Sequence, residues 1–312
     1  MRNAFTKKLV ELALKNKDVI LITNDAPTPH FLEFQKKVPE RFINVGLAEQ
    51  NMTGMAAGLA LSGKIPVTYS IVPFVMMRCY EQVRDDVCYQ NVNVKIIGIG
   101  AGIVYSTLGG THTPIEDISL ARGLPNLTIV SPADLMEAEK VAVEIFKIKG
   151  PVYVRLSRTG EPPVYEQDYK FKIGKGVLLK KGKDVTVVGY GSILYRAKKA
   201  AIELEKEGIS VELINVHTLV PFDEEGVLRS LRKTRAVVTI EEHGSIGGLK
   251  TIMSELLVRK KLNLPFESIS LEHKFLTNYG KQTEILDMLG FSISDIKRKV
   301  RKTIQFKGRI SK

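Results

Sequence analysis

Short, nearly uniformly apolar runs alternate with helix-length stretches along most of this 312-residue chain, and this alternation constrains the fold most strongly. In the first half the runs lie at 18–23, 42–46, 65–70, 93–100, 127–132 and 151–157. Runs of this kind predict strands that are covered on both faces. The helix-length segments between them predict parallel strands joined by crossover helices. We therefore expect an α/β protein with doubly wound sheets.

The pattern changes after residue 157, where the chain becomes rich in proline, tyrosine and charge. We interpret this part as a connection, with a short hairpin near 174–182. A second alternation of apolar runs and helical stretches then begins. The predicted organisation is a domain at 1–160, a linker at 161–183 and a second domain at 184–312. The chain is expected to end in two helices that break at Gly290, the second capped by Ser294.

Composition and charge exclude several classes of protein. Hydrophobic residues make up 44% and charged residues 26%, which is typical of a globular protein. No apolar run reaches the roughly 18 residues that span a bilayer, and the N-terminus does not resemble a signal peptide. Cys79 and Cys88 are expected to be buried, reduced thiols, which fits a cytoplasmic location. We expect no membrane association.

The net charge of +12 invites a nucleic-acid interpretation, which we do not favour because the charge is spread along the chain. Its one concentration, residues 297–312, holds eight Lys or Arg and no acid. A solvated last helix and tail explains this, and an acidic partner or anionic substrates are alternatives. No nucleic-acid-binding motif is present.

Two kinds of motif follow predicted strands. Glycine clusters at 98–102 and 189–192 do not complete a dinucleotide-binding loop, because Ile103 and Leu194 occupy the place of the third glycine. Glu49 is more informative, since it leads a helix of small, apolar residues. It could simply complement the helix dipole. A carboxylate that begins a buried helix is costly without a specific partner, however, so Glu49 is a candidate functional residue.

Longer segments carry a family resemblance. FINVGLAEQNMTGMAAGLALSGKIPVTYS (42–70), GGTHTPIEDISLARGLPNLTIVSPAD (109–134), GPVYVRLSR (150–158) and TIEEHGSIGGL (239–249) occur in order. They resemble the transketolase and deoxyxylulose-phosphate synthase family over nearly the whole chain. The resemblance implies a pyrimidine-binding domain followed by a transketolase C-terminal domain. It also implies that thiamine diphosphate is the cofactor.

The resemblance assigns cofactor roles to three residues. Glu49 matches the glutamate that hydrogen-bonds a ring nitrogen of the aminopyrimidine, and a carboxyl group in a dry pocket keeps or shares its proton. Phe74 is the best match to the aromatic residue that stacks on this ring. Asp25 matches an acidic residue near the cofactor.

Three more residues match substrate-binding positions. His112 corresponds to a histidine near the substrate carbonyl that moves a proton or stabilises charge. Arg158 corresponds to an arginine that grips the phosphate of a sugar, for which a forked guanidinium is suited. Arg78 resembles a phosphate-reading arginine of the deoxyxylulose-phosphate synthases.

Two positions depart from the family pattern. Leu108 occupies the place of an acidic residue of transketolases, and Gly100 that of a histidine that reads a donor hydroxyl. Without side chains that hydrogen-bond the hydroxyl groups of the donor sugar, an enzyme selects less strongly for a polyhydroxylated donor. We therefore expect an unusual donor substrate.

The Mg²⁺ motif of the family, GDG followed by Asn, is absent, and no metal-binding cluster appears. Because the chain begins directly at the pyrimidine-binding domain, we expect a separate N-terminal subunit that carries GDG…Asn and holds most of the Mg²⁺ site, in an α2β2 assembly.

The leading functional hypothesis is transfer of a two-carbon ketol unit between sugar phosphates. Alternatives within the family are a deoxyxylulose-phosphate-synthase-like or 2-keto-acid-dehydrogenase-β-like enzyme that uses a keto-acid donor. A non-catalytic subunit on the same fold and a basic nucleic-acid binder are weaker alternatives.

Overall fold

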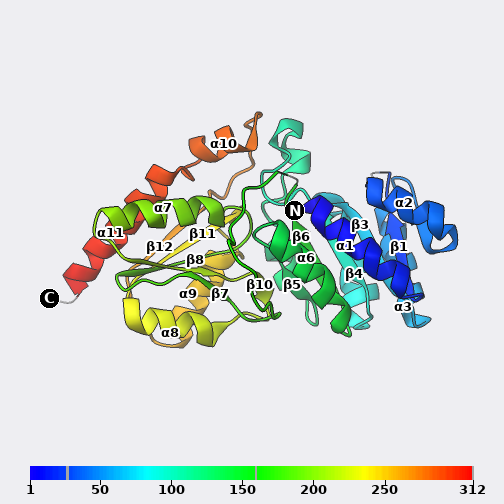
Figure 1. Cartoon of the computed structure of the whole chain (residues 1–312), viewed down its shortest axis with the longest axis horizontal. Coiled ribbons are helices and arrows are strands. Elements are labelled where there is room, and N and C mark those ends of the chain that lie inside the picture. Colours follow the sequence, from blue (N-terminus) through cyan, green and yellow to red (C-terminus); the bar gives the residue numbers. More distant parts are fainter. Residues whose placement is uncertain (26–27, 159, 311–312) are drawn as a thin grey trace.

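Each half of the chain is built on its own sheet (Figure 1). The computed structural model describes residues 1–25, 28–158 and 160–310. In this part of the chain the first sheet has the order β10-β5-β6-β4-β3-β1-β2. Its strands are β1 (Val19–Thr23), β2 (Phe42–Asn44), β3 (Ile65–Ile71), β4 (Lys95–Ile99), β5 (Thr128–Val130), β6 (Val152–Leu156) and β10 (Thr218–Val220).

Helices cover both faces of this sheet, which is why its central strands β3, β4 and β6 are buried along almost their whole length. The helices and short helical turns of this half are α1 (Arg2–Lys15), α2 (Pro29–Lys37), η1 (Pro39–Arg41), α3 (Glu49–Leu61), η2 (Pro73–Met77), α4 (Tyr80–Gln82), η3 (Val83–Tyr89), η4 (Ser106–Leu108), η5 (Gly110–His112), α5 (Asp117–Arg122), α6 (Leu135–Glu144) and η6 (Ile145–Lys147). Helices α1, α2 and α6 pack on one face, and α3, η2, η3 and α5 pack on the other.

The second sheet has the order β12-β11-β8-β9-β7 in the described residues. Helices α7 and α11 cover one face, and α8 and α9 cover the other (Figure 1). The elements are β7 (Val177–Lys180), β8 (Val185–Gly189), α7 (Leu194–Lys206), β9 (Val211–Asn215), α8 (Glu224–Thr234), β11 (Val237–Gly244), α9 (Leu249–Arg259), β12 (Phe266–Leu271), α10 (Gln282–Met288) and α11 (Ile293–Ile310).

The predicted α/β class is confirmed, since all strand pairs except β10–β5 and β7–β9 are parallel. The hairpin expected near 174–182 is wrong, because β7 pairs with β9 and not with the next strand along the chain, β8. The domain boundaries at 160 and 183 stay a prediction.

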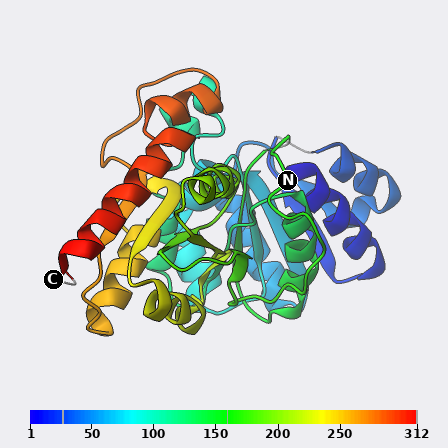
Figure 2. The same ribbon diagram turned by 60° about the vertical axis from the view of Figure 1, so that its left-hand side comes forward.

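Several segments join the two halves. Strand β10 leaves the second half and pairs antiparallel with β5 at the edge of the first sheet. The segment before α10 returns to the first half, where the Ser106 hydroxyl donates to the Gly280 carbonyl at 2.8 Å. Figure 2 shows α10, in orange, beside the loop that follows β4. The second half therefore supports the loop that carries His112.

The structure confirms the predicted burial of the two cysteines and the predicted break at Gly290. Cys79 and Cys88 are free and buried, and burial raises their pKa values to about 11 and about 12. Among the described residues, no helix combines the length and apolar character needed to cross a bilayer. The chain turns at Gly290, in a left-handed conformation, between α10 and α11 as predicted.

Candidate active site

Glu49 is the first residue of α3 and is fully buried. The loop from β2 to α3 turns at Gly46, whose φ of 65° favours glycine. Helix α3 buries Met52, Ala56 and Ala57 against the sheet, and this packing draws its first turn inward. The carboxylate therefore lies at the positive end of the helix dipole, in a place that water does not reach.

Both oxygens of Glu49 have a partner. Asn24, directly after β1, donates from Nδ2 to Oε1 at 2.9 Å, and Arg78 donates from Nη1 to Oε2 at 2.7 Å. Burial alone would raise the pKa of Glu49. The hydrogen bonds from Asn24, from the backbone and from Arg78 outweigh burial and lower the pKa below its usual range. With these partners Glu49 favours the ionised form, and the expectation that it keeps or shares its proton beside the aminopyrimidine stays a prediction.

Phe74, on η2, contacts both Arg78 and His112. The guanidinium carbon of Arg78 is 4.3 Å from the centroid of the Phe74 ring. His112 meets the same ring edge-on, with centroids 5.2 Å apart and an interplanar angle of 84°. The ring thus connects the residue beside the carboxylate to the histidine on the loop after β4.

His112 is half-buried at the end of η5. Its Nδ1 is 2.9 Å from the hydroxyl of Thr111. Burial lowers the pKa of His112 below its usual 6.5, so the ring is neutral near pH 7. A neutral imidazole can accept a proton or, from its N–H, donate a hydrogen bond.

A cavity of about 190 Å³ adjoins this cluster. Pro73 and Met77 line it from η2, Thr111 lines it from the His112 loop, and Phe275 and Leu276 line it from the segment before α10. The second half of the chain therefore contributes part of the wall beside the candidate site.

In the described residues, no hydrogen bond, ion pair or ring contact joins the side chain of Arg158 or Asp25 to this cluster. Arg158 follows β6, which lies beside β4 but three positions from β1, the strand before Asn24, or about 14 Å at normal strand spacing. It lines a separate cavity of about 560 Å³ that α7, α10 and the start of α11 also line. Asp25 is exposed and directly follows Asn24.

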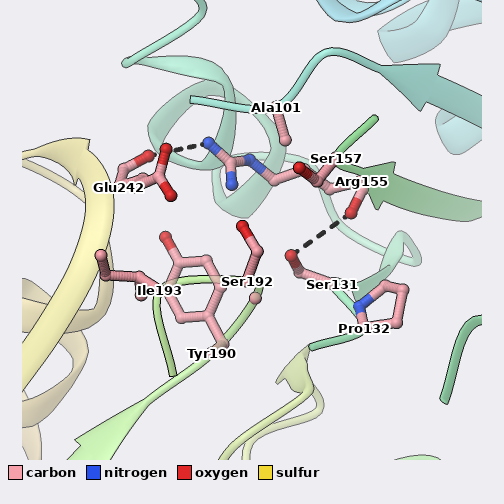
Figure 3. Close-up of a pocket in the computed structure, with 10 residues that line it drawn as sticks. Ala101, Ser131, Pro132, Arg155, Ser157, Tyr190, Ser192, Ile193 and Glu242 are labelled. Carbon is pink, nitrogen blue, oxygen red and sulfur yellow. Dashed lines mark hydrogen bonds between the residues drawn. The ribbon is translucent and has the colours of Figure 1, made fainter. Parts of the chain in front are cut away.

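The junction between the halves contains a small polar pocket of about 10 Å³, enough for one water molecule (Figure 3). Figure 3 shows Arg155 reaching across it to Glu242 on β11. The Arg155 guanidinium donates to the Glu242 carbonyl at 3.0 Å and to the buried Asp117 carboxylate at 2.7 Å. The hydrogen bond between Arg155 and Glu242 joins the two halves at this pocket, which is too small for a cofactor.

Within the described ranges, no three His, Cys, Asp or Glu side chains are grouped so that they could hold a metal ion.

Comparisons with known proteins identify the family. Residues 1–162 match the model of the transketolase pyrimidine-binding domain, and residues 174–296 match that of the transketolase C-terminal domain. A 6-deoxy-6-sulfo-D-fructose transketolase subunit of Clostridium sp. (strain MSTE9) is 38% identical, over 90% of this chain and 89% of that one. The chain belongs to the transketolase family.

Two further comparisons support the same conclusion. An apulose-4-phosphate transketolase subunit of Phocaeicola vulgatus is 35% identical, over 91% of this chain and 94% of that one. A solved structure described as a split gene transketolase, inactive beta4 tetramer, superimposes with a TM-score of 0.87. It is 37% identical and covers 97% of each chain. This transketolase-family chain therefore matches the two subunits and the split-gene structure over most of the length of each.

The two departures from the transketolase pattern have a structural counterpart. Gly100 has a φ of 78°, and a Cβ there would lie 2.2 Å from the ring of Tyr105. Tyr105 therefore fills the space that a side chain at position 100 would need. Leu108 is 53% exposed.

Two residues near the candidate site were not predicted, namely Asn24 and Tyr105. Asn24 could have been predicted from its position at the carboxyl end of a predicted strand, where ligand-binding residues of open α/β sheets lie. No sequence signal placed Tyr105 against Gly100.

Proposed function

We propose that this chain is the C-terminal subunit of a two-chain transketolase, which transfers a two-carbon ketol unit between sugar phosphates with thiamine diphosphate. The observation that carries the proposal is that one guanidinium, that of Arg78, bonds the fully buried Glu49 carboxylate and also lies over the half-buried Phe74 ring. A buried acceptor beside an aromatic face suits a planar ring that donates N–H groups. The Arg78 guanidinium, itself planar and rich in N–H, already makes both contacts.

These residues fit the aminopyrimidine end of the cofactor. Glu49 would hold a ring nitrogen, Phe74 would stack on the ring, and Asp25 would lie nearby. Bound thiamine diphosphate supplies the electron sink for cleaving a carbon–carbon bond next to a ketone. These residues of the chain bind and orient the ring, and their packing keeps water away from Glu49.

The substrate-binding roles of the next three residues are proposed from where their side chains lie. The neutral His112 can accept a proton from a substrate hydroxyl or hydrogen-bond its oxygen. Arg158, exposed at the end of β6, suits a phosphate at the far end of an extended sugar chain. Arg78 can bind a second anionic group once it leaves Glu49.

Activity on this proposal needs a separate N-terminal subunit with a GDG…Asn motif, which would hold the diphosphate and Mg²⁺ in an α2β2 assembly. The domain limits would be 1–160 and 184–312. The two buried free thiols support a reducing, cytoplasmic location.

The donor is proposed to be an unusual sugar phosphate or a modified sugar. The supporting observation is that Tyr105 fills the place of a polar side chain at position 100. The two subunit relatives are named for 6-deoxy-6-sulfo-D-fructose and for apulose 4-phosphate, which are a modified sugar and a sugar phosphate.

Replacement of Glu49 tests the proposal. With the partner subunit present, Glu49→Gln should lower the rate of ketol transfer by about 10²–10⁴-fold, because the cofactor ring loses its ionisable partner. The assay should follow ketol transfer and carbon dioxide release separately over a panel of donors. Release of carbon dioxide from a keto acid would favour the alternative function.

The exposed Glu40, on η1, provides the matched control, and Glu40→Gln should retain full activity. Unchanged turnover of the Glu49→Gln enzyme would refute the assignment. Absence of any turnover in the wild-type pair would favour a non-catalytic subunit.

A further inference from the structure

Arg78 makes the two contacts that a planar, N–H-donating ring would make in this site. Its Nη1 donates to Oε2 of Glu49 at 2.7 Å, and its guanidinium carbon lies 4.3 Å from the centroid of the Phe74 ring. One flat cationic group thus satisfies the buried acid and covers the aromatic ring. The guanidinium occupies the place that the proposed function gives to the aminopyrimidine.

The two oxygens of Glu49 are held by partners of different mobility. Asn24 is 3% exposed and is fixed at the end of β1, so its bond to Oε1 is part of the framework. The side chain of Arg78 is 42% exposed and lies in the turn between η2 and α4, so its guanidinium can swing into solvent without unfolding either helix. A ring that enters the site therefore has to displace one side chain, Arg78, and can then donate a hydrogen bond to Oε2 of Glu49.

We propose that Arg78 is a positioning residue that occupies the aminopyrimidine place in the free subunit, satisfies Glu49 there, and withdraws when the cofactor enters. This inference rests on the proposed function. It explains how a carboxylate that is 0% exposed remains stable before the holoenzyme is assembled, since an unpaired buried charge is strongly destabilising. It also gives the withdrawn guanidinium a second use at an anionic substrate.

The withdrawal changes the charge of Glu49. With Arg78 in place, the carboxyl group has a lowered pKa and is ionised. When Arg78 leaves, the effect of burial remains and favours the protonated form. The other groups that face Glu49 are Asn24, which does not titrate, and the Cys79 thiol, whose pKa burial raises to about 11. Asp86, from η3, faces α3 at Gly54.

The test is thiamine diphosphate binding to the assembled pair in the presence of Mg²⁺. Calorimetry gives the dissociation constant and, in buffers of different ionisation enthalpy, the number of protons taken up. Arg78→Met should bind thiamine diphosphate about tenfold more tightly than wild type, because the cofactor no longer displaces a charge-assisted hydrogen bond. Wild type should take up a proton on binding and bind more tightly as the pH falls. The variant should lose most of this proton uptake.

Arg78→Lys provides a second variant, which keeps the charge but loses the planar fork. It should bind thiamine diphosphate more tightly than wild type but less tightly than Arg78→Met, and it carries the test if the methionine variant does not fold. Arg84→Met is the control, because Arg84 is 62% exposed and pairs with its neighbour Asp85. It should bind as wild type does.

Equal or weaker cofactor binding by both Arg78 variants, with unchanged proton uptake, would overturn the inference. Arg78 would then be a permanent partner of Glu49. A wild-type pair that does not bind thiamine diphosphate would instead refute the proposed function. The two failures are therefore distinguishable.

Discussion

Glu137, on α6, joins the two halves of the chain through one buried carboxyl group. It accepts hydrogen bonds from the Tyr165 hydroxyl at 2.8 Å and from Nδ2 of Asn215, on β9, at 2.9 Å. The backbone N–H of Ala133 donates to it at 2.6 Å. Burial nevertheless raises its pKa to about 7. The native protein thus holds a proton that the unfolded chain releases near pH 4.5.

This difference predicts a pH dependence of stability. Between pH 4.5 and about 7 the native state binds more protons than the unfolded state, so the contribution of Glu137 to stability falls as the pH rises. The free energy of unfolding of wild type minus that of Glu137→Gln should fall by on the order of 3 kcal/mol over this range. Urea unfolding at several pH values measures it. A constant difference would show that Glu137 is ionised throughout, and the exposed Glu225→Gln is the control.

How much of the site the sequence could predict depends on the residue. Glu49 was a candidate from chemistry alone, because a carboxylate leading an apolar helix needs a partner. The structure brings it together with Arg78, Phe74 and His112. The partner Asn24 was not predicted, since a polar residue after a strand is common. Only the packing of α3 beside β1 makes it a neighbour of Glu49.

At the scale of elements, the sequence predicted the central strands and the break at Gly290, because hydrophobic runs and a left-handed glycine are local signals. The predicted hairpin was wrong because the pairing of β7 depends on a strand that is distant in the sequence. A strand after a turn-rich segment normally suggests a hairpin, but the partner of β7 is β9, more than thirty positions further along the chain. The addition of β10 to the first sheet is also a long-range pairing. Local patterns do not encode such pairings.

The cap of α11 is a smaller correction at the same scale. The side chain that accepts the N–H of Asp295, at 3.1 Å, is Ser292 and not Ser294. The spacing Ser292-x-x-Asp295 is that of a capping box, which is the signal that identifies the cap. The hydroxyl of Ser292 is also within hydrogen-bond distance of the Asp295 carboxylate.

Substitution of the two serines separates these interpretations. Ser292→Ala should lower the free energy of unfolding by about 1 kcal/mol, because one backbone N–H at the start of α11 loses its partner. Ser294→Ala, at an exposed position inside the helix, should change it by less than about 0.5 kcal/mol. Chemical denaturation of the two variants measures both values. The reverse order of the two effects would identify Ser294 as the cap.

The basic residues near the C-terminus stand without acids in the sequence but have acidic neighbours in the folded molecule. The basic stretch at 297–312 contains several cations that pair with acids of neighbouring elements. Lys297 lies 2.7 Å from Glu203 and 2.8 Å from Glu207, both at the end of α7 or beside it. Lys299 lies 2.9 Å from Glu267 on β12. These pairs link α11 to α7 and β12, and the interpretation of a solvated last helix and tail stays a prediction.

The coupling of the two halves depends on the buried ion pair of Arg155 and Asp117. Both side chains are almost fully buried, and Arg155 also bonds the Glu242 carbonyl of the second half. Arg155→Met should lower the free energy of unfolding by about 3–5 kcal/mol, because Asp117 is left buried without its counter-ion. The double variant Arg155→Met/Asp117→Asn removes the uncompensated charge and should regain much of this loss. Calorimetric unfolding of the single and double variants measures both effects.

If the double variant is no more stable than Arg155→Met, the loss comes from the contact with β11 and not from the unpaired acid. Of the interactions that Arg155 makes, the hydrogen bond to Glu242 would then be the one that stabilises the contact between the halves.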